Sequence, residues 1–135
     1  MSTSLMTLIT AITAAKIYAV FTLIVISFQL ALAAGAPWGS ISMGGKFPGV
    51  YPKKMRIAAI FMGAFLAMQA LIVAVSAGWI YPEWKAAISR LIWLVVVINV
   101  LGFLMNLITP SRWERIIWAP VALIFLLCSV LVAWS

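Results

Sequence analysis

The chain has 135 residues, of which 67% are hydrophobic and 8% are charged, and its formal net charge is +7 at pH 7. A soluble domain carries roughly a quarter of its residues as charged side chains, so this composition excludes a soluble globular protein, and the length fits one domain. Basic residues that adjoin apolar segments match anionic lipid headgroups and the control of membrane orientation better than nucleic acid. We therefore expect a membrane protein with no nucleic-acid partner.

Four apolar segments are long enough to cross a bilayer, which takes about 20 residues in a helix. They cover residues 5–34, 57–80, 87–108 and 116–134. Helices are the expected way to cross, because lipid offers no hydrogen-bond partner to an open backbone. The sequence therefore predicts an all-α, polytopic membrane protein. Its single domain would be a four-transmembrane-helix bundle with one long interfacial loop at 35–56.

The first segment contains one charged residue, Lys16, about 16 Å along a helix that starts at Leu5. A charge at that depth would indicate a functional site. The other interpretation, which we favour, is that the span begins after Lys16 and the side chain extends to the membrane surface. The segment should end at Gly35 and Pro37, because glycine accepts the left-handed position after a helix and proline cannot continue one.

The segment 35–56 is rich in glycine, proline and basic residues and contains no acid. Consecutive glycines can turn backbone amides toward one point and bind an anion. Basic side chains would add charge, and a tryptophan would hold the segment at the membrane interface. The sequence therefore predicts a site for an anionic headgroup or partner, whereas the alternative is a basic loop that only sets orientation. The predicted residues are Trp38, Gly44, Gly45, Lys46, Lys53, Lys54 and Arg56.

Small residues recur at intervals of three and four along the second apolar segment. Glycine and alanine let helix backbones approach closely, which favours helix association in lipid. We interpret this stripe as a packing face within the same bundle, with contact to another copy or another protein as the alternative. Its residues are Gly63, Ala67, Ala70, Ala74 and Gly78.

Few polar side chains lie within the apolar segments. Polar groups in hydrocarbon cost free energy unless they are paired, so these side chains should point inward and form hydrogen bonds between helices. The alternative is that they line a polar path for a substrate. The residues are Lys16, Gln29, Gln69, Asn99 and Asn106.

The chain has two acidic residues, Glu83 and Glu114, and no histidine. Glu114 lies between Arg112 and Arg115, which predicts an ion pair within that loop. Imidazole-based metal or haem binding and histidine acid–base catalysis are excluded, and no carboxylate lies inside an apolar segment to drive proton-coupled transport. We therefore predict a protein that is not an enzyme and holds no metal and no cofactor.

Basic residues are distributed unequally between the two sides of the predicted bundle. Six adjoin the first and third connections, whereas two or three, depending on Lys16, adjoin the second connection and the termini. Cytoplasmic loops carry an excess of lysine and arginine. Loops one and three are therefore predicted to be cytoplasmic, with both termini outside.

The chain contains GAPWG at 35–39 and GG at 44–45, with Pro48 and Pro52 before Arg56. It also contains SRWER at 111–115, leading into WAPV at 118–121. In these runs, and in their order along nearly the whole chain, the sequence resembles a group of small four-helix bacterial inner-membrane proteins of unassigned function. The resemblance implies four helices and a bacterial inner membrane, and it implies no chemistry.

Two functions fit these observations. The first is a small integral membrane protein that binds anionic membrane lipids, or a partner in a larger membrane complex, through its basic segment 35–56. The alternative is a small homo-oligomeric transporter or channel with a polar path between its helices. A lipid-modifying enzyme is a distant third interpretation.

Overall fold

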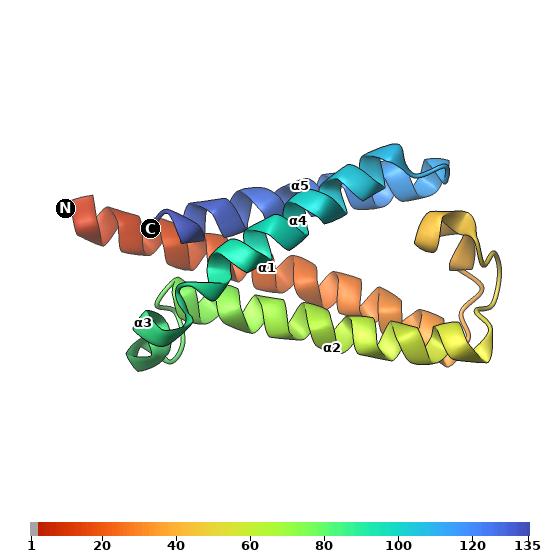
Figure 1. Ribbon diagram of the computed structural model, residues 1–135, viewed down its shortest axis with the longest axis horizontal. Coiled ribbons are helices and arrows are strands. Elements are labelled where there is room, and N and C mark those ends of the chain that lie inside the picture. The colour runs from red at the N-terminus through yellow and green to blue at the C-terminus, as the bar shows by residue number, and fades with distance from the viewer. Residues whose placement is uncertain (1–2) are drawn as a thin grey trace.

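The computed structural model describes residues 3–135, which contain helices and no strand, so the predicted all-α class is confirmed (Figure 1). Four of the helices are long and apolar enough to cross a membrane, as the sequence predicts. They are α1 (Thr3–Ala34), α2 (Lys53–Ser76), α4 (Leu91–Ile108) and α5 (Arg112–Ala133). The shorter helices are η1 (Gly39–Ile41) and η2 (Met43–Gly45) between α1 and α2, and η3 (Pro82–Trp84) and α3 (Lys85–Ile88) before α4.

The start of α2 differs from its predicted limit at residue 57. The helix begins at Lys53, directly after the N-cap Pro52, so Lys53, Lys54 and Arg56 are helical rather than part of a loop. The predicted start of this helix is set only by where the apolar residues begin. It therefore leaves out the first turn of the helix, which is polar. The connection between α1 and α2 is therefore shorter than predicted and covers residues 35–52.

Glycines in the left-handed conformation follow the ends of α1 and α2. Gly35 has φ +104° and Gly78 has φ +80°. After α2, the Trp79 amide donates to the Ala74 carbonyl at 3.1 Å, which is the bond of a glycine-terminated helix. The predicted end of the first helix is confirmed. In contrast, α2 ends at Ser76, before its predicted limit of 80, because Gly78 terminates it.

The long helices pack as two antiparallel pairs, α1 with α2 and α4 with α5, and the pairs meet mainly where α1 contacts α5. The helices α2 and α4 lie close together near α3 and diverge toward the opposite end (Figure 1). We call the end with residues 35–52 and 109–111 the loop end. The other end, near both termini, is the terminal end.

Buried apolar side chains fill the space between the helices toward the terminal end. All four long helices contribute, and α1 contributes three alanines that let its neighbours approach closely. The cluster, which we call the terminal cluster, consists of Ala11, Ala14, Ala15, Tyr18, Val73, Ala77, Ile92, Val95, Phe125, Cys128 and Val132. A smaller cluster at the loop end contains Leu32, Tyr51 and Ala59.

Part of the small-residue stripe of α2 packs against α1 of the same chain. Gly63 is buried, and a Cβ atom there would lie 3.9 Å from Cγ2 of Ile26. Ala74 is also buried. The prediction of packing within the bundle is wrong for Ala67, which is exposed. Gly78 lies just beyond the helix, and a Cβ atom there would lie 3.4 Å from Cδ1 of Leu8 on α1, so this member also packs against α1.

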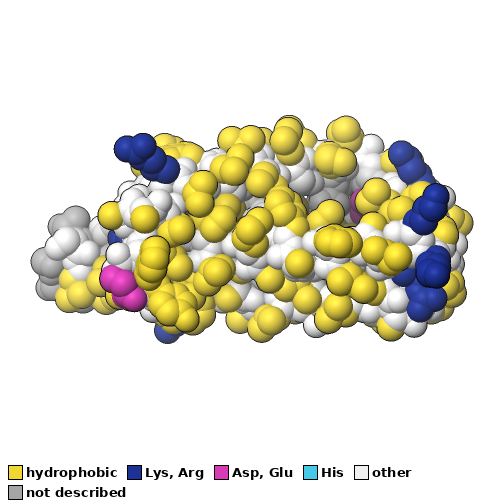
Figure 2. Space-filling view, turned by 60° about the horizontal axis from the view of Figure 1, so that its bottom comes forward, with side chains coloured by type: hydrophobic (Ala, Val, Ile, Leu, Met, Phe, Trp, Pro, Cys, Tyr) yellow, Lys and Arg dark blue, Asp and Glu magenta, His cyan; other side chains and the backbone are white. Residues whose placement is uncertain are grey.

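Basic side chains gather at the loop end, and Figure 2 shows most of the blue surface there. At the other end, Lys16 is exposed and its Nζ lies 5.8 Å from the centroid of the Trp79 ring. Trp79 follows the end of α2, so the ammonium group sits at the terminal end rather than between the helices. This placement agrees with the interpretation in which Lys16 extends to a membrane surface.

Candidate functional site

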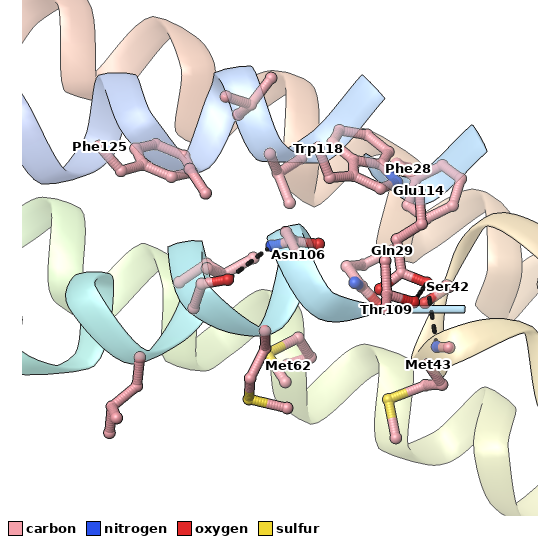
Figure 3. A pocket seen from close by; sticks show the side chains of 18 of the residues that line it. Phe28, Gln29, Ser42, Met43, Met62, Asn106, Thr109, Glu114, Trp118 and Phe125 are labelled. Carbon is pink, nitrogen blue, oxygen red and sulfur yellow. Dashed lines mark hydrogen bonds between the residues drawn. The ribbon is translucent and has the colours of Figure 1, made fainter. Parts of the chain in front are cut away.

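A cavity of about 780 Å³ lies where α2 and α4 diverge. The helices α2 and α4 form its sides, α1 and α5 form its back, and residues 41–46 cover its loop end (Figure 3). Its volume falls within the roughly 300–1,000 Å³ of small-molecule binding pockets. At its other end the cavity stops at the terminal cluster, since Phe125 belongs to both.

Most of the cavity lining is apolar. The rim residues Met62 on α2 and Leu101 and Met105 on α4 are exposed by 42%, 55% and 67%. Aromatic rings of Phe28 and Trp118 lie at the back, 4.7 Å apart between centroids. The cavity therefore opens sideways between two apolar helices, and flexible methionines at the rim suit a hydrocarbon ligand.

Polar side chains concentrate at the loop end of the same cavity. Figure 3 shows Gln29 of α1 beside Ser42 and Thr109, with Glu114 of α5 next to them. Lys46 also lines this end and is exposed. The cavity is therefore amphiphilic, with one charged end and a long apolar body.

Glu114 connects the loop 35–52 to the start of α5. Its Oε2 accepts a hydrogen bond from the Gly44 amide at 2.9 Å and another from Thr109 Oγ1 at 3.2 Å. Within residues 3–135 no ion pair joins Glu114 to Arg112 or Arg115, in contrast to the predicted loop ion pair. Arg115 instead donates to the Thr109 carbonyl. The carboxylate is used to hold two segments of the chain together.

The glycine turn does present its backbone to an anion, but the anion comes from the chain itself. Gly44 and Gly45 have φ +67° and +75°. The Gly44 amide donates to Glu114, and the Gly45 amide donates to the Ser42 carbonyl at 2.9 Å. These two amides are therefore satisfied internally, which corrects the prediction that they bind a headgroup or partner.

Two further hydrogen bonds attach the same loop to α5. Ser111 Oγ donates to the Ser40 carbonyl at 2.8 Å, and Trp118 Nε1 donates to the Ile41 carbonyl at 2.9 Å. Together with the Glu114 bond they form a set that we call the latch. Ser111 also caps α5 by accepting from the Glu114 amide at 3.3 Å, so this helix begins before its predicted limit of 116. The spacing Ser-x-x-Glu is a known helix-start signal that sequence reasoning missed.

The predicted basic residues differ in their availability. Arg56 Nε donates to the Ala33 carbonyl at 2.8 Å, where a positive charge stabilises the end of α1. Lys46, Lys53 and Lys54 are exposed. Two of these lysines occupy the start of α2, where the helix dipole is already positive, so the positive potential at this corner favours an anion.

Trp38 lies beside the cavity rather than within it. It is 48% exposed, and its ring stacks on Phe28 with an interplanar angle of 7° and a centroid distance of 6.2 Å. Phe28 in turn lines the cavity. Because Trp38 is exposed, its role at a membrane interface stays a prediction.

Hydrogen bonding between helices is present for Asn99. Its Nδ2 donates to Tyr18 Oη on α1 at 3.1 Å and to Ser129 Oγ on α5 at 3.2 Å. Asn106 instead bonds within its own helix, with Nδ2 donating to the Gly102 carbonyl at 2.8 Å. Sequence reasoning missed Tyr18 and Ser129, whose hydroxyl groups inside apolar segments were the available signal.

The two glutamines behave differently from the asparagines. Gln29 and Gln69 both line the cavity, and within residues 3–135 neither side chain has a hydrogen-bond partner. Gln69 is nevertheless only 3% exposed. Both residues therefore belong to the cavity lining and do not join helices directly.

Comparison of the chain with known protein families, with curated proteins and with solved structures found no match. The class of the protein rests on its own fold and site. Four apolar helices of spanning length around an amphiphilic cavity define an all-α protein of the multi-pass membrane class. The resemblance to small bacterial inner-membrane proteins stays a prediction.

Proposed function

We propose that this protein binds one lipid-like amphiphile in the cavity between α2 and α4 and performs no chemistry on it. The headgroup would lie at the loop end and the hydrocarbon chain would run along the apolar body. The single observation that carries the proposal is the lining, which is charged at one end and apolar beyond it. A free polar metabolite would leave most of that apolar surface unmatched.

The side opening supports a ligand that comes from the bilayer. In the proposed orientation the four helices form a transmembrane bundle, so the rim between α2 and α4 faces hydrocarbon. A lipid chain could then enter between these helices without crossing water. The exposed rim residues Met62 and Met105 would contact the chain as it enters.

The proposed headgroup is anionic, because the lysines near the cavity outnumber the one carboxylate that lines it, Glu114. Lys46 lines the loop end. Lys54 lies on the cavity side of α2. It is eleven positions before the lining residue Phe65, which places the two within about 20° of each other around the helix. Arg56 and Gly44 are left out of this proposal, because their donors named above are engaged within the chain.

The proposed location is a bacterial inner membrane with loops one and three in the cytoplasm. The excess of lysine and arginine at the loop end supports this orientation. Headgroups of the cytoplasmic leaflet would then lie level with Lys46, Lys53 and Lys54. An inner-membrane complex or a second copy of the chain stays a prediction.

The test is lipid binding to the purified full chain in detergent, measured by native mass spectrometry and titration. Phosphatidylglycerol and phosphatidylcholine with identical acyl chains serve as probes. Gly102→Leu fills the cavity at a position where an added Cβ meets no atom within 4 Å. We expect it to weaken phosphatidylglycerol binding at least tenfold. Ala64→Leu, on the exposed face of α2 outside the cavity, is the matched control and should change nothing.

A double variant distinguishes binding of the headgroup from binding of the acyl chain. Lys46→Gln with Lys54→Gln should reduce the preference for phosphatidylglycerol over phosphatidylcholine while phosphatidylcholine still binds. Equal binding of phosphatidylglycerol by the wild type and Gly102→Leu would refute the cavity as the lipid site. An unchanged preference in the lysine variant would refute the headgroup assignment.

The alternative, a polar path through a homo-oligomer, has one observation in its favour. Gln29, Gln69, Asn99 and Asn106 all line the same cavity. In one copy, however, the cavity ends against the terminal cluster, so these amides do not lead across the molecule. Unaltered flux through reconstituted Asn99→Leu and Asn106→Leu variants would remove them from a path.

A further inference from the structure

Gln69 lies at the blind end of the cavity, far from the charged loop end. The residue is only 3% exposed, and it lines the cavity. No hydrogen bond to its amide occurs within residues 3–135, although its polar atoms are not sealed off by protein. An amide left unpaired in apolar surroundings costs free energy, so a partner for this amide is expected inside the cavity.

No hydrogen bond within residues 3–135 joins Gln69 to Asn99, the other amide at this end. Asn99 Nδ2 donates to Tyr18 and Ser129, and its Oδ1 accepts from Tyr18 Oη at 3.5 Å. The remaining lining around Gln69 comes from apolar side chains such as Leu66 and Phe125. The missing partner is therefore part of whatever fills the cavity.

We infer that the bound amphiphile carries an uncharged hydroxyl group on its hydrocarbon chain and that this hydroxyl pairs with the Gln69 amide. The inference rests on the proposed lipid-binding function. A hydroxyl both donates and accepts, so it satisfies Oε1 and Nε2 together, whereas a carbonyl would satisfy Nε2 alone. A charged group is excluded because the residues that line this end include no countercharge and charge in hydrocarbon is costly.

The position of Gln69 sets where on the chain the hydroxyl belongs. Gly63 of α2 lies opposite Ile26 of α1. Counting outward from this contact with the helical rise places Gln69 about 13 Å from Gln29 along the helix axes. A headgroup beside Gln29 therefore puts the hydroxyl near the middle of a long acyl chain and not next to the headgroup.

The experiment compares three probes that differ only in the hydroxyl: stearate, 3-hydroxystearate and 12-hydroxystearate. Each is titrated against the full chain in detergent. We expect the wild type to bind 12-hydroxystearate at least tenfold more tightly than stearate, and 3-hydroxystearate no better than stearate. Gln69→Leu should lose the tenfold preference, because a leucine side chain offers no hydrogen bond to the hydroxyl. Gln29→Leu, the matched amide variant at the other end, should keep it.

Each other outcome counts against the inference. Equal binding of all three probes by the wild type, as expected if water pairs with Gln69, overturns it, and so does a preference that survives in Gln69→Leu. Gln69→Met repeats the test should the leucine variant fail to fold. Monoacyl phosphatidylglycerols with the same chains distinguish a phospholipid from a free acid as the source of the hydroxyl.

The same data separate this inference from the proposed function. If stearate binds and Gly102→Leu weakens it, but the hydroxyl brings no preference, only the hydroxyl inference fails. If no probe binds in a way that Gly102→Leu weakens, the proposed lipid site and the hydroxyl inference both fail.

Discussion

The terminal end and the loop end of this protein are held together by different kinds of interaction. At the terminal end, apolar side chains from four helices interlock, with three alanines of α1 admitting close neighbours. At the loop end, α2 and α4 stand apart, and the space between them is bridged by a loop that hydrogen-bonds to α5.

This difference suggests that the two ends have different roles, one in stability and the other in binding. The closely packed terminal cluster leaves no room for a ligand. The gap between α2 and α4, which the loop bridges, leaves a cavity that a ligand can enter. A membrane protein of this size can therefore be rigid at its terminal end and bind a ligand at its loop end. Stability measurements at each end test this difference.

The largest expected effect is at the terminal cluster. Ile92 is 2% exposed, so Ile92→Ala should lower the free energy of unfolding in detergent by about 2–5 kcal/mol through lost contacts and a residual void. Met105→Ala, on the cavity rim, should cost less than about 0.5 kcal/mol. Similar costs for the two variants would show that the two ends are equally well packed.

The next effect is within the loop. The Gly39 amide donates to the Gly49 carbonyl at 2.9 Å, and a Cβ at Gly39 would collide with the Phe47 carbonyl and lie 2.8 Å from that of Gly49. Gly39→Ala should therefore open residues 35–52 at a cost of about 1–3 kcal/mol. Hydrogen exchange of this loop should accelerate while α1 stays protected. Gly102→Ala, where nothing lies within 4 Å, is the control and should not destabilise the protein.

The smallest effect concerns the latch. Glu114→Gln keeps an acceptor but removes the charge that strengthens the bond from the Gly44 amide, so we expect a loss of about 1 kcal/mol. Faster hydrogen exchange at Gly44 is the direct measurement. Glu83→Gln changes the other acid of the chain, which is exposed at the terminal end, and should leave this exchange rate unaltered. An unchanged rate in Glu114→Gln would remove the carboxylate from the latch.

Composition and segment length were sufficient to predict the four long helices, because hydrocarbon demands about 20 apolar residues in a helix. The end of α1 was also predictable, since Gly35 carries a local conformational signal. Helix starts were less predictable. Lys53 and Arg112 open their helices with charged residues, which hydropathy places outside a span.

The candidate site was predicted only in part, because its contacts join residues far apart in sequence. The glycine turn was predicted to bind an external anionic headgroup or partner, whereas the anion that it meets is Glu114 of the same chain, 70 positions away from Gly44. Local charge favoured the adjacent arginines as partners instead. The glutamines of the cavity were identified, but a sequence does not show whether an amide meets another helix or an open space.

The bond between Gly44 and Glu114 has a consequence for the order of assembly. During synthesis the loop emerges long before α5, so its carboxylate partner is absent while the first three spanning helices insert. We expect the glycine turn to stay open until the last helix enters the membrane. A ribosome-bound chain that stops at Pro110 would then expose residues 35–52 to protease, and one that continues to the end would shield them.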